Sequence, residues 1–392
     1  MAEAYIVAAV RTAGGRRGGK LSGWHPVDLA AQVIDALLDR SGADPALVDD
    51  VIMGCVSQVG EQSTNVARNA VLASRLPESV PGTSLDRQCG SSQQALHFAA
   101  QAVMSGTQDV VIAAGVESMT RVPMFTPSSL PQKNGLGHYM SPQIRNQYGD
   151  TEFSQFTGAE MIAVKYGLEK ESLDRYALLS HQRAARATAE GRFDKEILPI
   201  RIRDAGGAET DELHTRDEGI RAEASLEGIA AVKLLAEGGR ISAATASQIC
   251  DGASGVMVVS ERGLKALGVK PLARIHHLSV IGHDPVIMLE APIPATERAL
   301  AKAGLKISDI DLYEVNEAFA PVPLAWLQKL GADPERLNVN GGAIALGHPL
   351  GASGTKLMTT LLHALEQRGG RYGLQTMCEG GGMANVTIVE RL

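Results

Sequence analysis

Cys89 stands at the junction between a predicted strand near residues 80–85 and an amphipathic helix that follows Gly90. The unpaired N–H groups and the positive dipole end of a helix N-terminus favour a thiolate over a thiol. Lowering the pKa of a cysteine from about 8.5 to about 7 takes roughly 2 kcal/mol, which a helix terminus and one further partner can supply. Cys89 is therefore a candidate nucleophile, although its position alone suits a buried structural cysteine equally well.

A second cysteine, Cys378, follows a predicted strand over residues 371–377 and precedes Glu379 and three glycines. Ligands of open α/β sheets bind at the carboxyl ends of the strands. Glycines in series let the backbone approach a reacting group and point N–H donors at it. We therefore expect a functional loop here rather than a flexible turn before the last strand, residues 384–390.

His348 lies in a glycine-bounded turn before a predicted helix, and Asn316 closes a predicted strand. The proline after the histidine fixes an extended backbone, and the glycines leave the imidazole room to meet a substrate. A neutral imidazole can donate to a carbonyl oxygen or accept a thiol proton near working pH. A lone histidine is more often structural, which is our interpretation of His97, His276 and His277.

Composition excludes several classes of protein. The chain has 392 residues, a formal net charge of −7 and no basic run, which argues against a nucleic-acid partner. Its four cysteines are far apart and favour reduced thiols in a cytosolic protein over disulfides or a zinc site. The N-terminus reads as a short strand rather than a signal peptide, and no apolar run is long enough to span a bilayer. We expect a cytoplasmic protein without membrane insertion.

Elements of the first 115 residues return near the C-terminus. Short apolar runs alternate with helical periodicity in a βαβαβαβ order, which predicts a largely parallel sheet with helices packed on it. Residues 42–54 resemble 304–316, and the same spacing aligns 89–91 with 351–353 and 109–115 with 371–377. We predict two copies of one fold, with the helices after Cys89 and Gly351 paired at the centre between two sheets.

Four short motifs follow one another along this duplicated chain: C-G-S at 89–91, N-E-A-F-A at 316–320, G-H-P-L-G at 347–351 and C-E-G-G-G-M at 378–383. Together they resemble the thiolase family over essentially the whole length. The resemblance implies an α/β fold whose duplicated βαβαβαββ halves form a layered αβαβα arrangement, with an inserted loop domain. It also implies assembly as a homodimer or homotetramer. The implied boundaries are 1–120 plus 246–270 for the first half, 121–245 for the loop domain and 271–392 for the second half.

The resemblance also implies a role for each site residue. Cys89 is the nucleophile that holds the acyl group, and Cys378 is the acid and base. His348 lies against the thioester and the nucleophile, and Asn316 holds a water that completes one oxyanion hole with it. The backbone N–H groups of Cys89 and Gly380 form the other oxyanion hole. The implied reaction is thiolytic cleavage of a 3-ketoacyl-CoA to acetyl-CoA and a shortened acyl-CoA. Coenzyme A is the co-substrate, with no permanently bound cofactor and no metal.

Residues 121–245 have no counterpart in the second copy and are rich in arginine, including four in loop-like sequence: Arg201, Arg203, Arg216 and Arg221. Solvated basic faces account for most of these. The resemblance makes the insertion the loop domain that holds CoA. It places Arg221, in a D-E-x-x-R pattern, at the nucleotide end, and Ser247 against the pantetheine.

Departures from the family pattern bear on the acyl pocket. Residues 154–161 and 283–292 differ from the motifs usual in acetoacetyl-CoA thiolases, and the glycines common after Met288 are missing. Met288 and Phe319 complete the predicted substrate contacts. The chain looks closer to degradative 3-ketoacyl-CoA thiolases, including those for bulky or steroid-derived acyl chains, than to acetoacetyl-CoA-forming acetyl-CoA acetyltransferases.

Two further alternatives remain at this point. A 3-ketoacyl synthase shares the fold and a nucleophilic cysteine, but decarboxylation supplies its carbanion and it does not need Cys378. An inactive lipid or sterol carrier could use the same scaffold. Retention of Cys89, His348, Asn316 and Cys378 together speaks against the carrier.

Overall fold

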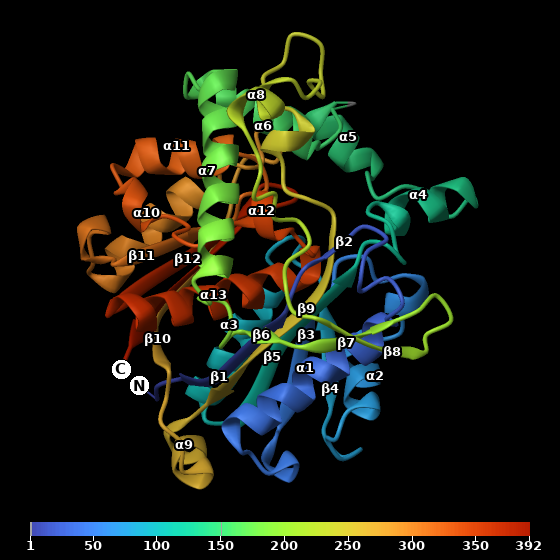
Figure 1. Cartoon of the computed structure of the whole chain (residues 1–392), viewed down its shortest axis with the longest axis vertical. Coiled ribbons are helices and arrows are strands. Elements are labelled where there is room, and N and C mark those ends of the chain that lie inside the picture. The colour runs from blue at the N-terminus through green and yellow to red at the C-terminus, as the bar shows by residue number, and fades with distance from the viewer. Residues whose placement is uncertain (1, 150) are drawn as a thin grey trace.

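The computed structural model describes residues 2–149 and 151–392 as a layered α/β protein (Figure 1). Its first half follows the predicted βαβαβαββ order, interrupted before the last strand. Its elements are β1 (Tyr5–Thr12), β2 (Gly15–Arg16), α1 (Pro26–Ser41), β3 (Asp50–Gly54), α2 (Val66–Ala73), β4 (Gly82–Leu85), α3 (Ser91–Ser105), β5 (Val110–Ser118) and β9 (Cys250–Val259). The strand β2 is a short addition that pairs with β9.

The second half repeats this order at the spacing read from the sequence, since β11, α13 and β12 each begin 262 residues after β3, α3 and β5. After the connecting helix α9 (Glu261–Leu267), its elements are β10 (Ala273–Gly282), α10 (Pro292–Ala303), β11 (Leu312–Val315), α11 (Pro321–Leu330), α12 (Ala343–Leu346), α13 (Ser353–Arg368), β12 (Tyr372–Glu379) and β13 (Met383–Arg391). The internal duplication predicted from the sequence is therefore present in the fold.

The counterpart of β4 is reduced to a single β-bridge in the second copy. Where β4 would recur beside β11, only a single parallel bridge joins Tyr313 to Leu337. The side chain of Asn338 takes over the pairing, because its Oδ1 accepts from the Val315 amide and its Nδ2 donates to the Val315 carbonyl, both at 2.9 Å. A side-chain amide thus satisfies the backbone groups that a strand would otherwise pair.

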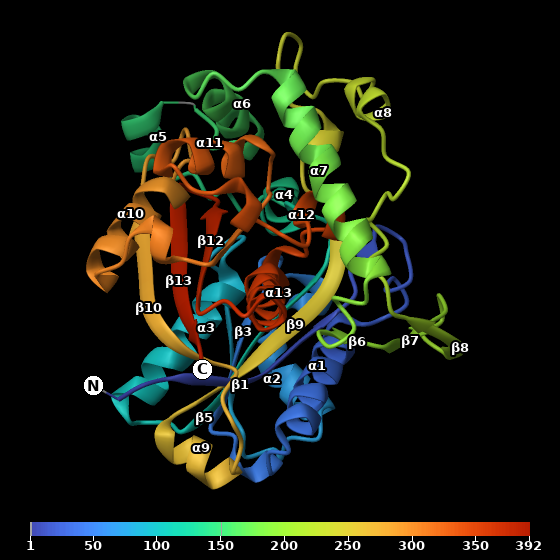
Figure 2. The ribbon, with the colours of Figure 1, turned by 60° about the vertical axis from the view of Figure 1, so that its left-hand side comes forward.

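The two apolar helices α3 and α13 pack against each other at the centre, as predicted. Figure 2 shows α13 nearly end-on, between β10, β13 and β12 on one side and β9 on the other. Helix α1 covers the outer face of the first half and α10 that of the second. The result is the five-layer αβαβα arrangement, with one outer apolar core in each half and a central core around α3 and α13 that both halves share.

Within the described chain, one 11-stranded sheet contains nine strands in the order β11-β12-β13-β10-β1-β9-β5-β3-β4, with β2 paired to β9 and β6 of the insertion paired to β1. The two halves join where β1 meets β10 through only two residue pairs, Tyr5 with Arg274 and Ile6 with Ala273. Because the sheet diverges beyond this short junction, its halves can stand on opposite sides of α3 and α13 (Figure 2).

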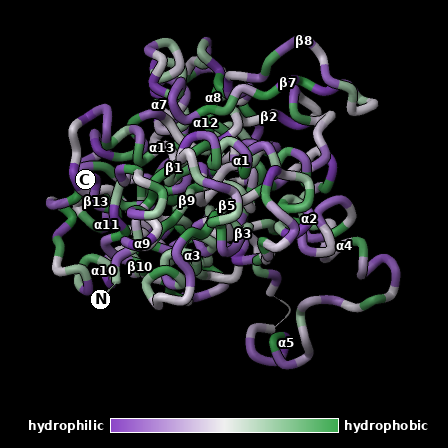
Figure 3. Tube along the Cα trace, turned by 90° about the horizontal axis from the view of Figure 1, so that it is seen from below, coloured by the Kyte–Doolittle hydropathy of each residue, from purple (hydrophilic) through white to green (hydrophobic). Residues whose placement is uncertain are grey.

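The insertion lies between β5 and β9 and contains α4 (Thr126–Lys133), α5 (Pro142–Tyr148), α6 (Gln155–Lys165), α7 (Lys170–Ala189), β6 (Ile197–Leu198), β7 (Ile200–Arg203), β8 (Glu209–His214) and α8 (Leu226–Ala230). Helices α4 and α5 extend away from the body (Figure 3). The prediction that Arg201 and Arg203 lie in loop-like sequence is wrong, because both belong to β7 of a two-stranded hairpin. The domain boundaries themselves stay a prediction.

No helix in the described part of the chain is both long and apolar enough to cross a membrane.

Candidate active site

Cys89 lies in a tight turn between β4 and α3. The turn places Gln88 at a φ of +48°, a left-handed conformation that costs energy for a residue with a side chain. Ser91 holds the turn together, because its hydroxyl donates to the Gln88 carbonyl at 2.6 Å and accepts from the Arg87 amide at 2.9 Å. The sequence prediction of a strand, a turn and a helix around Cys89 is confirmed.

The predicted ionisation of Cys89 is wrong for the resting site. Burial of the thiol, followed by the negative charge of Glu379, raises the pKa of Cys89 to about 12. The N-terminus of α3 does not overcome these two effects, because Cys89 is partly buried and a buried carboxyl group acts on it. Cys89 is therefore a neutral thiol at rest and needs a base that removes its proton during reaction.

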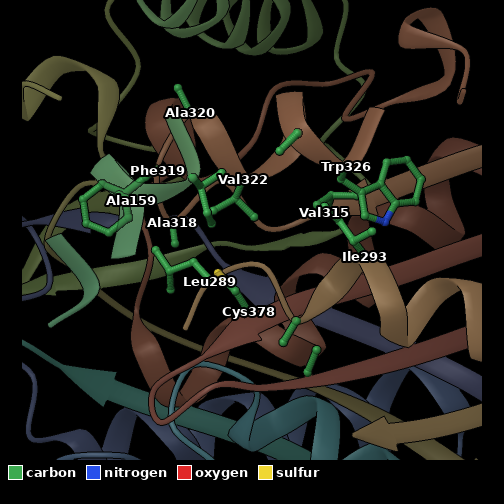
Figure 4. Close-up of a cluster of buried hydrophobic side chains, with 14 of the residues drawn as sticks. Ala159, Leu289, Ile293, Val315, Ala318, Phe319, Ala320, Val322, Trp326 and Cys378 are labelled. Carbon is green, nitrogen blue, oxygen red and sulfur yellow. The ribbon is translucent and has the colours of Figure 1, made fainter. Parts of the chain in front are cut away.

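Cys378 is the last residue but one of β12 and is fully buried. Its sulfur lies among apolar side chains that include Leu289 and Ala318 (Figure 4). Burial, and then negative charge at Cys89 or Glu379, raises the pKa of Cys378 well above its usual value. The two sulfurs are thus within electrostatic reach of each other, and Cys378 is a thiol that can give up a proton only to a strong base.

The loops that carry the two cysteines are in direct contact. A Cβ atom on Gly380 would lie 2.9 Å from the Gln88 side-chain oxygen, and one on Gly90 would lie 1.9 Å from a Glu379 carboxyl oxygen. Only glycine fits at such a close approach. The backbone of Gly380 therefore faces the turn that holds Cys89.

His348 and Asn316 form a second buried pair behind Cys378. Asn316 follows β11, and its amide donates to the carbonyl of Thr376, two residues before Cys378. Its Nδ2 lies 3.3 Å from His348 Nε2, and its Oδ1 has no hydrogen-bond partner in the described chain. Burial, followed by the charge of Lys356, lowers the pKa of His348 to about 3, so the imidazole is neutral at physiological pH.

Comparison with known proteins decides the family. The family model "Thiolase, N-terminal domain" matches residues 4–262, and "Thiolase, C-terminal domain" matches residues 269–391. This chain belongs to the thiolase family. The resemblance and the fold class inferred from its motifs are both confirmed.

Its relatives in the thiolase family include proteins named 3-ketoacyl-CoA thiolases. The chain is 55% identical to "Steroid 3-ketoacyl-CoA thiolase FadA6" of Mycobacterium tuberculosis, over 100% of this chain and 95% of the relative. It is 43% identical to a "3-ketoacyl-CoA thiolase" of Pseudoalteromonas translucida, over 99% and 98%. Among solved structures, human mitochondrial 3-ketoacyl-CoA thiolase is 35% identical with a TM-score of 0.89, covering 100% of this chain and 99% of that one.

Three of the predicted substrate contacts are grouped on the side of Cys378. Met288 and Phe319 belong to the same buried apolar cluster as Cys378. The amide of Ser247 donates to the Ala318 carbonyl at 2.9 Å, which places Ser247 beside this cluster. Arg221 is exposed, and its amide donates to His181 Nδ1 at 3.2 Å on α7 of the insertion. Arg221 thus lies outside the buried cluster, in the inserted segment.

Sequence reasoning missed several buried polar residues that hold this thiolase site in shape. Glu317 accepts from the hydroxyls of Tyr176 and Ser180 and from the Ile344 amide, and so ties the N-E-A-F-A loop to the insertion. Glu117 accepts from the Gly351 amide at 2.8 Å and fixes the turn that follows His348. Both glutamates lie in otherwise buried, apolar stretches, which is the only signal in the sequence that could have revealed them.

No group of three or more His, Cys, Asp or Glu side chains arranged to hold a metal ion is found among residues 2–149 and 151–392. The expectation that the protein binds no metal remains a prediction.

Proposed function

We propose that this protein is an acyltransferase of the 3-ketoacyl-CoA thiolase type, which cleaves its substrate with CoA through an acyl group on Cys89. The observation that carries the proposal is the meeting of the Cys89 turn with the Cys378 loop. A 3-ketoacyl synthase needs only the first cysteine. The similarity to enzymes named 3-ketoacyl-CoA thiolases supports the same choice.

The hydrogen bonds of His348 determine its tautomer, and its unprotonated ring nitrogen acts as the base. Ser353 donates its hydroxyl proton to the Pro349 carbonyl, so it accepts from His348 Nδ1, and the lone pair of Nε2 accepts from Asn316 Nδ2 at 3.3 Å. In the complex with the 3-ketoacyl-CoA, His348 Nε2 takes the Cys89 proton as the sulfur adds to the 3-keto carbon. The new Nε2–H and a water held by Asn316 Oδ1 then stabilise the alkoxide.

The remaining steps use Cys378. The bond between C2 and C3 breaks, the alkoxide returns to a carbonyl as acyl-Cys89, and the Cys378 thiol protonates the departing acetyl-CoA enolate. CoA then gives its thiol proton to the Cys378 thiolate and attacks acyl-Cys89, whose oxyanion the amides of Cys89 and Gly380 hold. Cys89 leaves and recovers its proton from His348, so every group returns to its starting state.

The acyl chain lies, in this proposal, against the cluster that contains Met288 and Phe319. Gly158 of α6 packs on the carbonyl of Ile287, and Phe156 meets Phe319 edge-on at 5.6 Å. Both stretches that depart from the acetoacetyl-CoA pattern thus form one apolar wall beside Cys378. This favours medium, long or bulky acyl chains, in keeping with the printed name of the 55% identical relative.

Coenzyme A, in this proposal, reaches Cys89 past Ser247, with Arg221 at its nucleotide end. We also propose a homodimer or homotetramer in the cytoplasm. The segment from α4 to α5 exposes large apolar side chains, including Phe125 at 55% and Leu136 at 79%, which a partner subunit could cover. The four unpaired cysteines suit a reducing compartment.

The test is single-turnover mass spectrometry. The protein is mixed with a 3-ketoacyl-CoA in the absence of CoA, and then CoA is added. We expect an acyl adduct on the peptide that contains Cys89, together with one equivalent of acetyl-CoA, and loss of the adduct when CoA arrives. Decarboxylation of a malonyl thioester without cleavage of 3-ketoacyl-CoA would instead identify a synthase.

A further inference from the structure

Glu379 is a buried carboxyl group to which the proposed mechanism gives no role. It follows Cys378 directly and is fully buried. Neither carboxyl oxygen has a hydrogen-bond partner of normal geometry within the described chain, although the Asn385 backbone amide, after Arg87, favours the carboxylate. A buried, unpaired carboxylate is costly, so such a group is expected to hold its proton or to find a partner during function.

The internal duplication provides a direct comparison, because Glu117 occupies the equivalent position at the end of β5. The Glu117 carboxylate is also fully buried, but it accepts from four N–H donors: the Val56, Ser57 and Gly351 amides and the Gln62 side chain, all within 3.0 Å. Gly351 is the repeat counterpart of Cys89. The same backbone position therefore carries a fully satisfied carboxylate in one half and an unsatisfied one in the half that contains Cys378.

The unsatisfied carboxyl lies against Gly90, the residue that follows the proposed nucleophile. Its Oε1 lies so close to the Gly90 Cα that a methyl group there would overlap with it, at 1.9 Å. Gly90 is bonded to Cys89, and a negative charge on Glu379 is the main charged group that opposes ionisation of Cys89. The same charge also opposes ionisation of Cys378.

Other charged or titratable groups around Glu379 modify this effect. Arg87 favours the Glu379 carboxylate, yet it forms no ion pair with it in the described chain, and its Nη1 points to the Met383 sulfur at 3.7 Å. Asp86 and Glu117 add smaller negative contributions at Cys89. His97 of α3 lies near Arg87, and burial lowers its pKa to about 3, so it stays neutral. Burial raises the pKa of Glu379 itself to about 8.

We propose that Glu379 is a positioning residue that controls the ionisation of Cys89: as the neutral acid it permits thiolate formation, and as the carboxylate it holds Cys89 in the thiol form. This inference rests on the proposed role of Cys89 as the nucleophile. Ionisation of Cys89 is then suppressed once Glu379 has lost its proton, because two negative charges on adjacent buried groups cannot be accommodated together.

The test follows alkylation of Cys89 by iodoacetamide from about pH 6 to about pH 10, with peptide mass spectrometry as the readout. In the wild-type protein, the logarithm of the rate should rise with a slope below one above about pH 8, because Glu379 loses its proton first. Glu379→Gln should restore a slope of one and react about tenfold faster near pH 9. A slope of one in the wild type, or an unchanged rate in the variant, would overturn the inference.

Two further variants distinguish an electrostatic effect of Glu379 on Cys89 from a loss of structure. Asp86→Asn removes another carboxyl that acts on Cys89 and keeps an acceptor for the Gln88 amide. It should shift the curve slightly and leave its shape unchanged. Arg87→Gln removes the cation that favours the Glu379 carboxylate, so Glu379 should stay neutral to higher pH and alkylation near pH 9 should be faster. The readout is independent of turnover: the expected pH profiles of the wild type and Glu379→Gln, found without any acyl-enzyme, would count against the proposed function but not against the effect of Glu379 on the Cys89 thiol.

Discussion

The Nδ1 atom of His348 lies 2.5 Å from the hydroxyl oxygen of Ser353, the first residue of α13. Ser353 is the repeat counterpart of Ser91, which begins α3 and binds only the turn around Gln88. In the first copy this serine stabilises the start of a helix. In the second copy the equivalent serine, Ser353, instead determines the tautomer of His348. This tautomer carries its proton on Nδ1, so the unprotonated nitrogen is Nε2, which lies beside Asn316.

Ser353→Ala should therefore lower kcat by about tenfold or more with little change in KM, since a positioned base typically contributes about 10²- to 10⁴-fold. Steady-state kinetics on one 3-ketoacyl-CoA would measure this. Ser353→Thr is the matched variant, because it keeps the hydroxyl, and we expect it to retain most of the activity. Equal loss in both variants would indicate a packing role for Ser353.

Replacement of the two cysteines should separate their roles. Cys378→Ala should still form an acyl-enzyme on Cys89, slowly, but turnover should fall about 10²- to 10⁴-fold because the enolate has no proton donor. Cys89→Ala should form no acyl-enzyme. Intact-mass measurement after addition of an acyl-CoA distinguishes the two. Turnover of Cys378→Ala at the parent rate would contradict the mechanism.

The reactivity of the four cysteines should follow exposure and pH. Cys89 is partly exposed, whereas Cys55, Cys250 and Cys378 are buried. Substoichiometric iodoacetamide should label Cys89 first. Because the pKa of Cys89 is raised to about 12, labelling should be slow at neutral pH and continue to accelerate beyond about pH 9. Fast labelling that already levels off near neutral pH would restore the sequence-based expectation of a partly ionised thiol.

The apolar wall beside Cys378 predicts a preference that grows gradually with the length of the acyl chain. Each buried methylene contributes about 0.8 kcal/mol, so kcat/KM should climb along a series from four carbons to long chains and one steroid-side-chain thioester. Phe156→Ala should flatten the slope, because Phe156 supports Phe319. Phe98→Ala is the control, since Phe98 is similarly exposed, at 42% against 41%, but lies on α3. A maximum at four carbons would return the protein to the acetoacetyl-CoA branch.

The two equivalent glutamates should affect stability in opposite ways. The pKa of Glu379 rises from 4.5 when unfolded to about 8 when folded, so the folded state binds the extra proton in this range and stability falls as pH rises. Glu379→Gln should remove this slope and stabilise the protein at pH 8 by roughly 2–4 kcal/mol. Glu117→Gln should destabilise it, because it weakens four hydrogen bonds. Urea unfolding at several pH values measures both, and a stabilised Glu117→Gln would contradict the comparison.

Local patterns in the sequence determined the elements, the duplication and the candidate residues. The strand before Cys89 and the helix after it are properties of neighbouring residues, and the repeat spacing is preserved because both copies must pair the same strands around α3 and α13. The thiolase motifs were sufficient to select Cys89, Asn316, His348 and Cys378, since each motif is a short continuous stretch.

Only the tertiary structure decided the electrostatics of the site. The pKa of Cys89 depends on Glu379, which is 290 positions away in the chain, and on how completely both groups are removed from water. Likewise, Glu117 and Glu379 hold equivalent positions in the repeat, yet in the described chain Glu117 accepts four hydrogen bonds of normal geometry and Glu379 accepts none. Burial and charge act through distances across the fold, and residue types along the chain do not contain those distances.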